Sequence, residues 1–158
     1  MREIPLSPLT EAAFAPFGTL VEYSAGENRR RLVDELQNTR AEQGPQLDFA
    51  TVSPRALPIS ATKMERHRHS SQSFIPVDVA RYLVVVAPDA DGAPDLARAR
   101  AFAASGRQSI TYRAGVWHHP LTPLDRTGSF AILTFRAGDA GDEEWATLAE
   151  PLRLGAAG

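Results

Sequence analysis

The sequence contains four histidines, and all of them fall in two short segments. His67 and His69 are two positions apart, so on an extended strand both imidazoles point to the same face. Gln72 follows three positions later, and its amide oxygen can join the two rings if the chain turns before it. His118 and His119 are adjacent, so a strand can present only one of them to that interior. We expect it to be His118, because the proline after the pair favours an extended, turn-like backbone.

Three imidazoles and one oxygen ligand suit a divalent transition metal such as nickel, zinc, manganese or iron. The sequence therefore predicts a metal site with the ligands His67, His69, Gln72 and His118. The H-x-H spacing alone fits equally well two exposed histidines on an arginine-rich turn, whose positive charge disfavours a bound cation. The second segment favours the metal, because a turn at Gly115 delivers His118 from behind a bulky aromatic residue.

Two charged residues precede the first histidine on the same expected strand face. Glu65 is our candidate proton acceptor, because a carboxylate beside an apolar interior can have its pKa raised toward neutrality. An ion pair between Glu65 and Arg66, or another arginine at the rim, is the alternative. Lys63, the only lysine, either binds a substrate carboxylate or, as we favour, neutralises Glu65. We predict that His118 acts in catalysis together with Glu65.

Two further residues are candidates for substrate binding. Tyr112 could donate a hydrogen bond to a polar substrate, although its alternation with Ile110 also fits a core position. Arg113 could bind a carboxylate through two parallel N–H groups, but a shift of one residue in register would turn it to the other face. Trp117 we expect to pack in the interior.

Composition and charge narrow the class of protein. The chain has 158 residues, of which 43% are hydrophobic and 23% charged, which predicts one globular domain over residues 1–158. The longest apolar run, residues 82–87, is too short to span a bilayer, and the first residues lack the apolar core of a secretory signal. No cysteine is present, so we expect a cytoplasmic protein. A net charge of −2 does not favour nucleic-acid binding.

The hydrophobic pattern is dominated by short strands separated by turns. Strands are expected over residues 19–23, 47–52, 57–67, 73–76, 81–87, 108–113 and 129–135. Helices are expected over residues 10–14, 28–37, 96–104 and 142–148, and residues 155–158 are expected to fray. This pattern favours an antiparallel sandwich or barrel.

Several motifs, in matching order along most of the chain, resemble one known family. They are ERH at 65–67, SQSFIP at 71–76, RYLVVVAP at 81–88, PDL and RAF at 94–96 and 100–102, and YRAGVWHHPL at 112–121, with a weaker match at 9–18. The chain resembles ureidoglycolate lyase, a cupin-like enzyme of allantoin degradation. The GVWHHPL stretch is the most specific of these motifs.

The resemblance implies a mainly β fold, a cupin-like antiparallel β-barrel (double-stranded β-helix) with a few short helices. It also implies a homodimer, stimulation by a divalent cation, with nickel named for the family, and cleavage of ureidoglycolate to glyoxylate and urea in purine nitrogen catabolism. The substrate is a carbinolamide, so cleavage needs a base for its hydroxyl proton and an acid for the departing nitrogen. No water is consumed, and Tyr112 could then donate to the ureido oxygen.

The sequence departs from the family at a few positions, and two other functions fit the same residues. Arg68 replaces a usual proline, Thr111 an expected asparagine, and residues 135–136 an Asp-Arg pair. The first alternative is hydrolysis of ureidoglycolate with release of ammonia and carbon dioxide. The second is a non-catalytic cupin that binds a small organic acid as a sensor.

Overall fold

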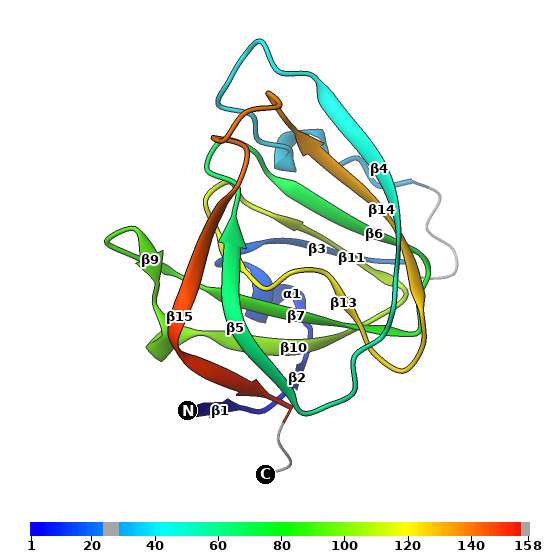
Figure 1. Ribbon diagram of the computed structural model, residues 1–158. Coiled ribbons are helices and arrows are strands. Elements are labelled where there is room, and N and C mark those ends of the chain that lie inside the picture. The colour runs from blue at the N-terminus through cyan, green and yellow to red at the C-terminus, as the bar shows by residue number, and fades with distance from the viewer. Residues whose placement is uncertain (24–28, 156–158) are drawn as a thin grey trace.

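The computed structural model describes residues 1–23 and 29–155, which form two main β-sheets (Figure 1). The first strands are β1 (Arg2–Ile4), β2 (Ser7–Pro8), β3 (Gly18–Glu22), β4 (Pro45–Val52), β5 (Ile59–Arg66), β6 (Gln72–Asp78), β7 (Arg81–Ala87) and β8 (Asp89–Ala90). They continue with β9 (Ala93–Pro94), β10 (Arg100–Ser105), β11 (Gln108–Tyr112), β12 (Trp117–His118), β13 (Thr122–Pro123), β14 (Gly128–Phe135) and β15 (Glu144–Leu154). The helical elements are α1 (Glu11–Phe14) and the 3-10 turns η1 (Val33–Glu35) and η2 (Leu96–Arg98).

The two sheets have separate strand orders. The eight-stranded sheet runs β1-β15-β5-β12-β7-β10-β2, with β13 also paired to β7, and the five-stranded sheet runs β3-β11-β6-β14-β4. Neighbours are antiparallel except for the pairs β1–β15 and β2–β10, while β8 and β9 form a small hairpin. The predicted mainly β, antiparallel class is therefore confirmed. Among the described residues, no helix has the length and apolar character needed to cross a membrane.

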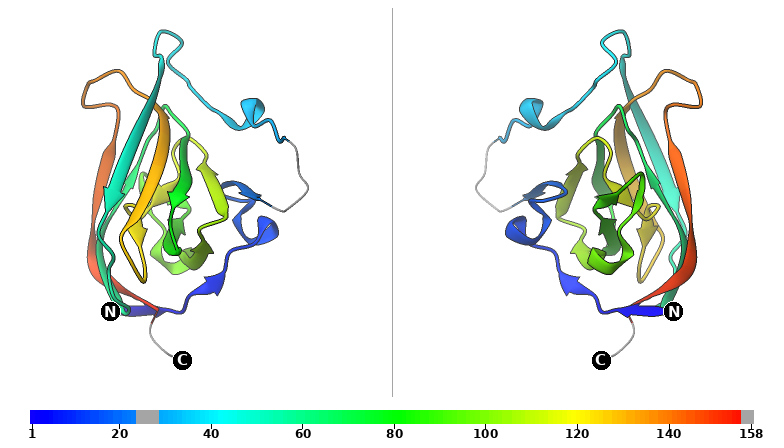
Figure 2. Two further views of the ribbon diagram at one scale, coloured as in Figure 1. Left: turned by 90° about the vertical axis from the view of Figure 1, so that its right-hand side faces the viewer. Right: turned by 90° about the vertical axis from the view of Figure 1, so that its left-hand side faces the viewer.

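The sheets curl into a half-barrel around a shared interior (Figure 2). In Figure 1, β5 and β15 lie in front of β7 and β10, and apolar side chains of these four strands pack together in one cluster. Strand β7 is consequently buried on both faces, which explains its continuous run of apolar residues. Its residues Val84 and Val86 face the interior between the sheets with Phe74 and Phe130, and its residue Val85 faces the layer under β5 and β15.

Local structure agrees with most of the strand predictions. The expected strands correspond to β3, β4, β5, β6, β7, β11 and β14, with ends shifted by a few residues. The predicted helix at residues 10–14 is confirmed as α1, where the hydroxyl of Thr10 accepts a hydrogen bond from the Ala13 amide at 3.2 Å.

Three helix predictions are wrong. Residues 96–104 hold only η2, after which β10 pairs with β7, because cross-strand burial of residues such as Phe102 outweighs the helix propensity of an alanine-rich segment. The segment 142–148 enters β15, which pairs with β5. Within residues 28–37 only η1 forms, and residue 28 lies outside the described residues. The fraying predicted at 155–158 concerns residues that, apart from Gly155, are likewise not described.

Candidate active site

The short strand β12 places one of the histidine pair in the interior. His118 pairs with Glu65 of β5 on one side and with Val86 of β7 on the other, so its side chain shares the face of the core between the sheets. The imidazole is 1% exposed and stacks on the Tyr112 ring, with centroids 4.2 Å apart and an interplanar angle of 14°. The expectation that this histidine, rather than His119, reaches the interior group agrees with the structure.

The hydrogen bonds of His118 define where its lone pair points. Its Nδ1 lies 2.9 Å from the main-chain oxygen of Val116, which can only accept, so Nδ1 carries a proton. In a neutral ring, Nε2 then has a lone pair, and it lies 3.0 Å from Oε1 of Gln72 and 3.6 Å from Oε1 of Glu65. Three electron-pair donors therefore face one another, an arrangement that a proton or a cation between them stabilises.

His67 adds a fourth donor atom to this group. Its Nδ1 lies 2.8 Å from the main-chain oxygen of Asp142, and its Nε2 is buried without a hydrogen-bond partner. The centroids of the His67 and His118 rings are 5.5 Å apart. Ligand atoms of Glu65, His67 and His118 all lie within 4.8 Å of one another. An orphaned, buried imidazole nitrogen aimed at a carboxylate and a second imidazole fits the donor set of a divalent transition metal.

The charges at the site differ from the sequence expectation. Burial raises the pKa of Glu65, but the interaction with His118 and the positive charge that the neighbouring histidines carry when protonated together lower that pKa below its ordinary value. The predicted upward shift is therefore wrong, and Glu65 is a carboxylate anion at neutral pH. Burial, followed by the charge of His118, lowers the pKa of His67, which is a neutral imidazole there. One carboxylate anion and two imidazole nitrogens form a donor set that can hold a divalent metal.

The second predicted imidazole of the H-x-H motif lies outside this group. β5 ends at Arg66 and the chain turns through residues 68–69, so the two-residue alternation of a strand no longer applies. His69 is half-buried, and its Nδ1 lies 2.9 Å from the hydroxyl of Thr39. Gln72, by contrast, starts β6 and reaches His118. The metal role of His69 stays a prediction that this placement does not favour.

The remaining predicted site residues, Lys63, Arg113 and Tyr112, differ in their exposure to solvent. Lys63 is exposed, with its Nζ 4.3 Å from the centroid of the Trp145 ring, and Arg113 is exposed just after β11. Tyr112 is buried against His118, and burial raises the pKa of its hydroxyl well above the ordinary value. A substrate-binding role for each of these residues stays a prediction.

Arg66 does not pair with Glu65. Its guanidinium binds the carboxylates of Asp89 and Glu144 and lies over the Trp117 ring, 4.3 Å from the centroid. Trp117 is 1% exposed and donates from Nε1 to Asp89 at 2.9 Å. Its predicted packing role is confirmed.

Two residues that sequence reasoning missed hold the histidine segments in place. Gln37 accepts hydrogen bonds from the Ala114 amide at 2.8 Å and from the Ser71 amide at 2.9 Å, which ties the two segments together from outside. Asp142 is buried, accepts from the amides of Ala137 and Gly138, and so fixes the carbonyl that His67 contacts. The turn-rich sequence around Asp142 contained a signal, because an aspartate that follows glycine residues often closes a turn through its side chain.

Two mainly antiparallel sheets curled around a buried cluster of histidine and carboxylate side chains define a cupin-like protein with a candidate metal site. The sequence model of the family described as "Ureidoglycolate lyase" matches residues 1–154, and the chain belongs to this family. It is similar to the ureidoglycolate lyase of Burkholderia mallei (strain NCTC 10229), with 37% identity over 98% of this chain and 94% of the relative.

Two further relatives carry the name ureidoglycolate lyase, one of them as putative. A protein of Agrobacterium fabrum named putative ureidoglycolate lyase is 38% identical over 90% of this chain and 88% of its own length. The ureidoglycolate lyase of Pseudomonas savastanoi pv. phaseolicola is 32% identical over 90% of this chain and 88% of its length. Among solved structures, RmlC from Streptococcus suis gives a TM-score of 0.44 at 13% identity, over 65% of this chain and 49% of that one.

Proposed function

We propose that this protein is a lyase that cleaves ureidoglycolate to glyoxylate and urea in allantoin catabolism, working as a single cupin-like domain over residues 1–158. The observation that carries the proposal is the convergence of Glu65, His67 and His118 on one buried point. Membership of the ureidoglycolate lyase family supports the substrate. The reaction needs an anionic acceptor beside a group that can bind the substrate carboxylate and hydroxyl, and this cluster supplies both.

In the proposed mechanism, Glu65 accepts the proton of the substrate hydroxyl. Its lowered pKa keeps the carboxylate ionised and available before the substrate arrives. As the carbonyl of glyoxylate forms and the carbon–nitrogen bond breaks, the carboxyl returns the same proton to the departing urea nitrogen. Atoms and charge balance without water. His118 lies beside this carboxylate, with its Nε2 3.6 Å from Oε1 of Glu65, and would serve the reaction as a ligand of the metal proposed below.

We propose that a divalent metal, nickel among the candidates, is held by His67, His118 and Gln72, next to Glu65. When bound, such a metal would hold the substrate carboxylate and hydroxyl and lower the pKa of the hydroxyl. The orphaned Nε2 of His67 and the facing lone pairs around His118 support this assignment. Elemental analysis of protein purified without chelators measures occupancy and identity; activity that survives complete metal stripping would reject a metal role.

The direct test of the reaction is to mix purified protein with ureidoglycolate and assay urea, ammonia and glyoxylate separately. Equal amounts of urea and glyoxylate, with no ammonia, support the lyase. Ammonia without urea would reject it in favour of hydrolysis, and tight binding without turnover would reject it in favour of a sensor.

A homodimer and a cytoplasmic location complete the proposal. β4 is an edge of the five-stranded sheet, and its Leu47 and Phe49 are 58% and 75% exposed, which is typical of a strand covered by a second copy. Light scattering of the purified protein measures the oligomeric state, and a monomer at micromolar concentration would reject the dimer.

The absence of cysteine agrees with a reducing compartment, and fractionation of the source cells tests the location.

A further inference from the structure

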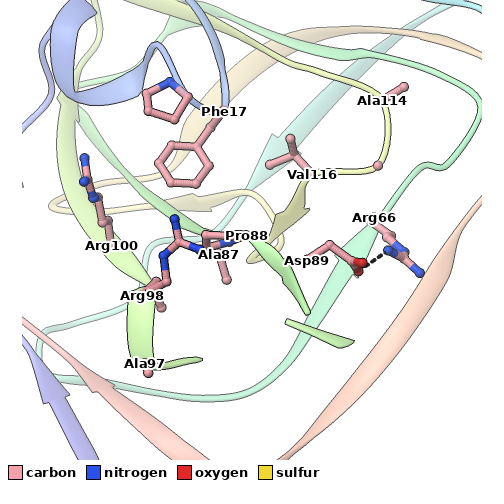
Figure 3. A pocket seen from close by; sticks show the side chains of 13 residues that line it. Phe17, Arg66, Ala87, Pro88, Asp89, Ala97, Arg98, Arg100, Ala114 and Val116 are labelled. Carbon is pink, nitrogen blue, oxygen red and sulfur yellow. Dashed lines mark hydrogen bonds and ion pairs between the residues drawn. The ribbon is translucent and has the colours of Figure 1, made fainter. Parts of the chain in front are cut away.

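A cavity of about 780 Å³ lies against residues 114–116, the segment that leads into β12 (Figure 3). Its apolar wall includes Phe17, Pro88 and Val116, and its charged residues include Asp89, Arg98 and Arg100. The residues that line it do not include Glu65, His67 or His118 of the described chain. The volume falls in the range of small-molecule sites, which are mostly apolar with a few placed polar groups.

The charges of this cavity are divided unevenly. Arg66 and Asp89 at one side are paired with each other, as the dashed line in Figure 3 marks, and Arg66 also binds Glu144. Arg98 has a side chain that is 73% exposed, and within residues 1–23 and 29–155 its one ion pair is a 4.0 Å contact with Asp95. The cavity therefore keeps positive charge on the Arg98 side.

Arg100 is held in place but keeps donors for a ligand. One of its guanidinium nitrogens donates to the main-chain oxygen of Ala13 at 3.3 Å, and the group lies 5.9 Å from the centroid of the Phe17 ring. A guanidinium carries five N–H donors in a planar fork that matches a carboxylate. Phe17 and its sequence neighbour Pro16 also line the cavity and add apolar atoms to its wall.

We propose that this cavity is a second ligand site, which binds a small organic carboxylate with a planar, apolar body. The carboxylate is held by Arg98 and Arg100, and the apolar body lies on Phe17, Pro88 and Val116. The two arginines require an anionic ligand, and the apolar wall favours a ring over a short acid such as acetate. The two features together define the class of ligand.

The wall formed by residues 114–116 connects this site to the candidate active site. The Gly115 amide donates to the main-chain oxygen of His67 at 2.8 Å, and the main-chain oxygen of Val116 lies 2.9 Å from Nδ1 of His118. A ligand on Val116 therefore contacts the segment that orients the His118 imidazole and holds the main chain of His67. Occupancy of the cavity should change the environment of the His67 and His118 rings without any ligand atom reaching them.

Tryptophan fluorescence can measure binding at this cavity. Its two tryptophans are Trp117 and Trp145, and the buried Trp117 donates to the cavity residue Asp89. In a Trp145→Phe background, Trp117 fluorescence is titrated with 3-phenylpropanoate. The matched probes are the neutral 3-phenylpropanamide, which lacks the charge, and acetate, which lacks the ring. We expect saturable binding of 3-phenylpropanoate and at least about tenfold weaker binding of the other two.

Variants assign the binding to the cavity. Arg98→Gln with Arg100→Gln should weaken 3-phenylpropanoate binding at least about tenfold, whereas Arg126→Gln, which changes an exposed arginine paired with Asp78, should not. Ring-carbon NMR signals of His67 and His118 should shift on titration. No saturation below about 10 mM would overturn the proposal, as would binding that the double variant leaves unchanged. Binding without imidazole shifts would overturn the connection. These readouts use no turnover, so their failure is independent of the proposed lyase activity.

Discussion

The Nδ1 atom of His67 lies 2.8 Å from the main-chain oxygen of Asp142, a residue 75 positions later in the chain. That carbonyl holds the proton on Nδ1 and leaves Nε2 as the lone pair that faces Glu65 and His118. The carbonyl is itself held, because the buried Asp142 carboxylate accepts from the Ala137 and Gly138 amides, both at 2.7 Å, and binds Arg40. The orientation of one imidazole thus depends on a turn far away in sequence.

The first prediction concerns this turn. Asp142→Asn keeps the size of the side chain but weakens its contacts with Arg40 and the amides, so the carbonyl should lose its fixed position. Metal affinity, measured by calorimetry with Ni²⁺ or Zn²⁺, should fall about 10- to 100-fold, as for other partners of ligating histidines. Asp139→Asn is the control, because Asp139 is in the same turn and contacts Arg40 but is 63% exposed. Equal effects of the two variants would contradict the prediction.

The second prediction separates a proton acceptor from a metal ligand at position 65. Glu65→Gln removes the charge with little change in shape. If Glu65 accepts the proton, turnover should fall about 10²- to 10⁴-fold while metal stays bound. If the carboxylate is instead a ligand, metal content falls together with turnover, and the proposed role is wrong. Glu150→Gln, far along β15 and exposed, serves as the control.

The third prediction concerns the two histidines of the H-x-H motif. His67→Ala removes the orphaned Nε2 and should abolish tight metal binding, whereas His69→Ala should leave it unchanged, because His69 contacts Thr39 outside the cluster. Both variants are compared by metal content after dialysis and by thermal unfolding. Loss of metal in His69→Ala would show that the turn at residues 68–69 rearranges to bring this ring into the site.

The contrast between these two histidines shows what the sequence could and could not predict. His67, Gln72 and His118 were identifiable by residue type, and the strand pattern correctly placed Glu65 next to His67. The position of His69 depends on where β5 ends, and strand ends are set by tertiary pairing rather than by the local pattern. The pKa of Glu65 depends on the balance between burial and a neighbour 53 positions away, which only the fold defines.

The alanine-rich segment 96–104, which contains η2 and most of β10, is a second case in which tertiary structure overrides local preference. Its composition favours a helix, but Ala101 and Phe102 pair with residues of β7 and contribute to two different apolar clusters. A strand can place adjacent residues in opposite layers, and a helix of this length cannot. Segment 100–105 forms a strand because it pairs with β7, which is buried on both faces. The local sequence of the segment does not show that β7 lies beside it.

The fourth prediction uses the carboxylate that binds two arginines. Hydrogen bonds from Arg68 and Arg66 lower the pKa of Glu144 to about 2 from the ordinary 4.5. Because the folded-state pKa is depressed, this contribution to stability is present above pH 4.5 and is lost as pH falls toward 2. In urea unfolding, Glu144→Gln should be less stable than the parent at pH 7, and the difference should narrow on acidification. A difference that is constant with pH would contradict the prediction.

The last prediction concerns the glycine between the two histidine segments. Gly115 has a φ of 82°, a conformation that side chains rarely adopt, although an added Cβ would meet nothing within 4 Å. Gly115→Ala should therefore cost about 1 kcal/mol through backbone strain rather than a clash. Because the Gly115 amide donates to the main-chain oxygen of His67, the strain should also weaken metal binding. Gly44→Ala is the matched control, since its Cβ would also meet open space without a positive φ. Thermal unfolding and calorimetry of both variants test this, and equal stabilities would show that the 114–116 segment relaxes without affecting the site.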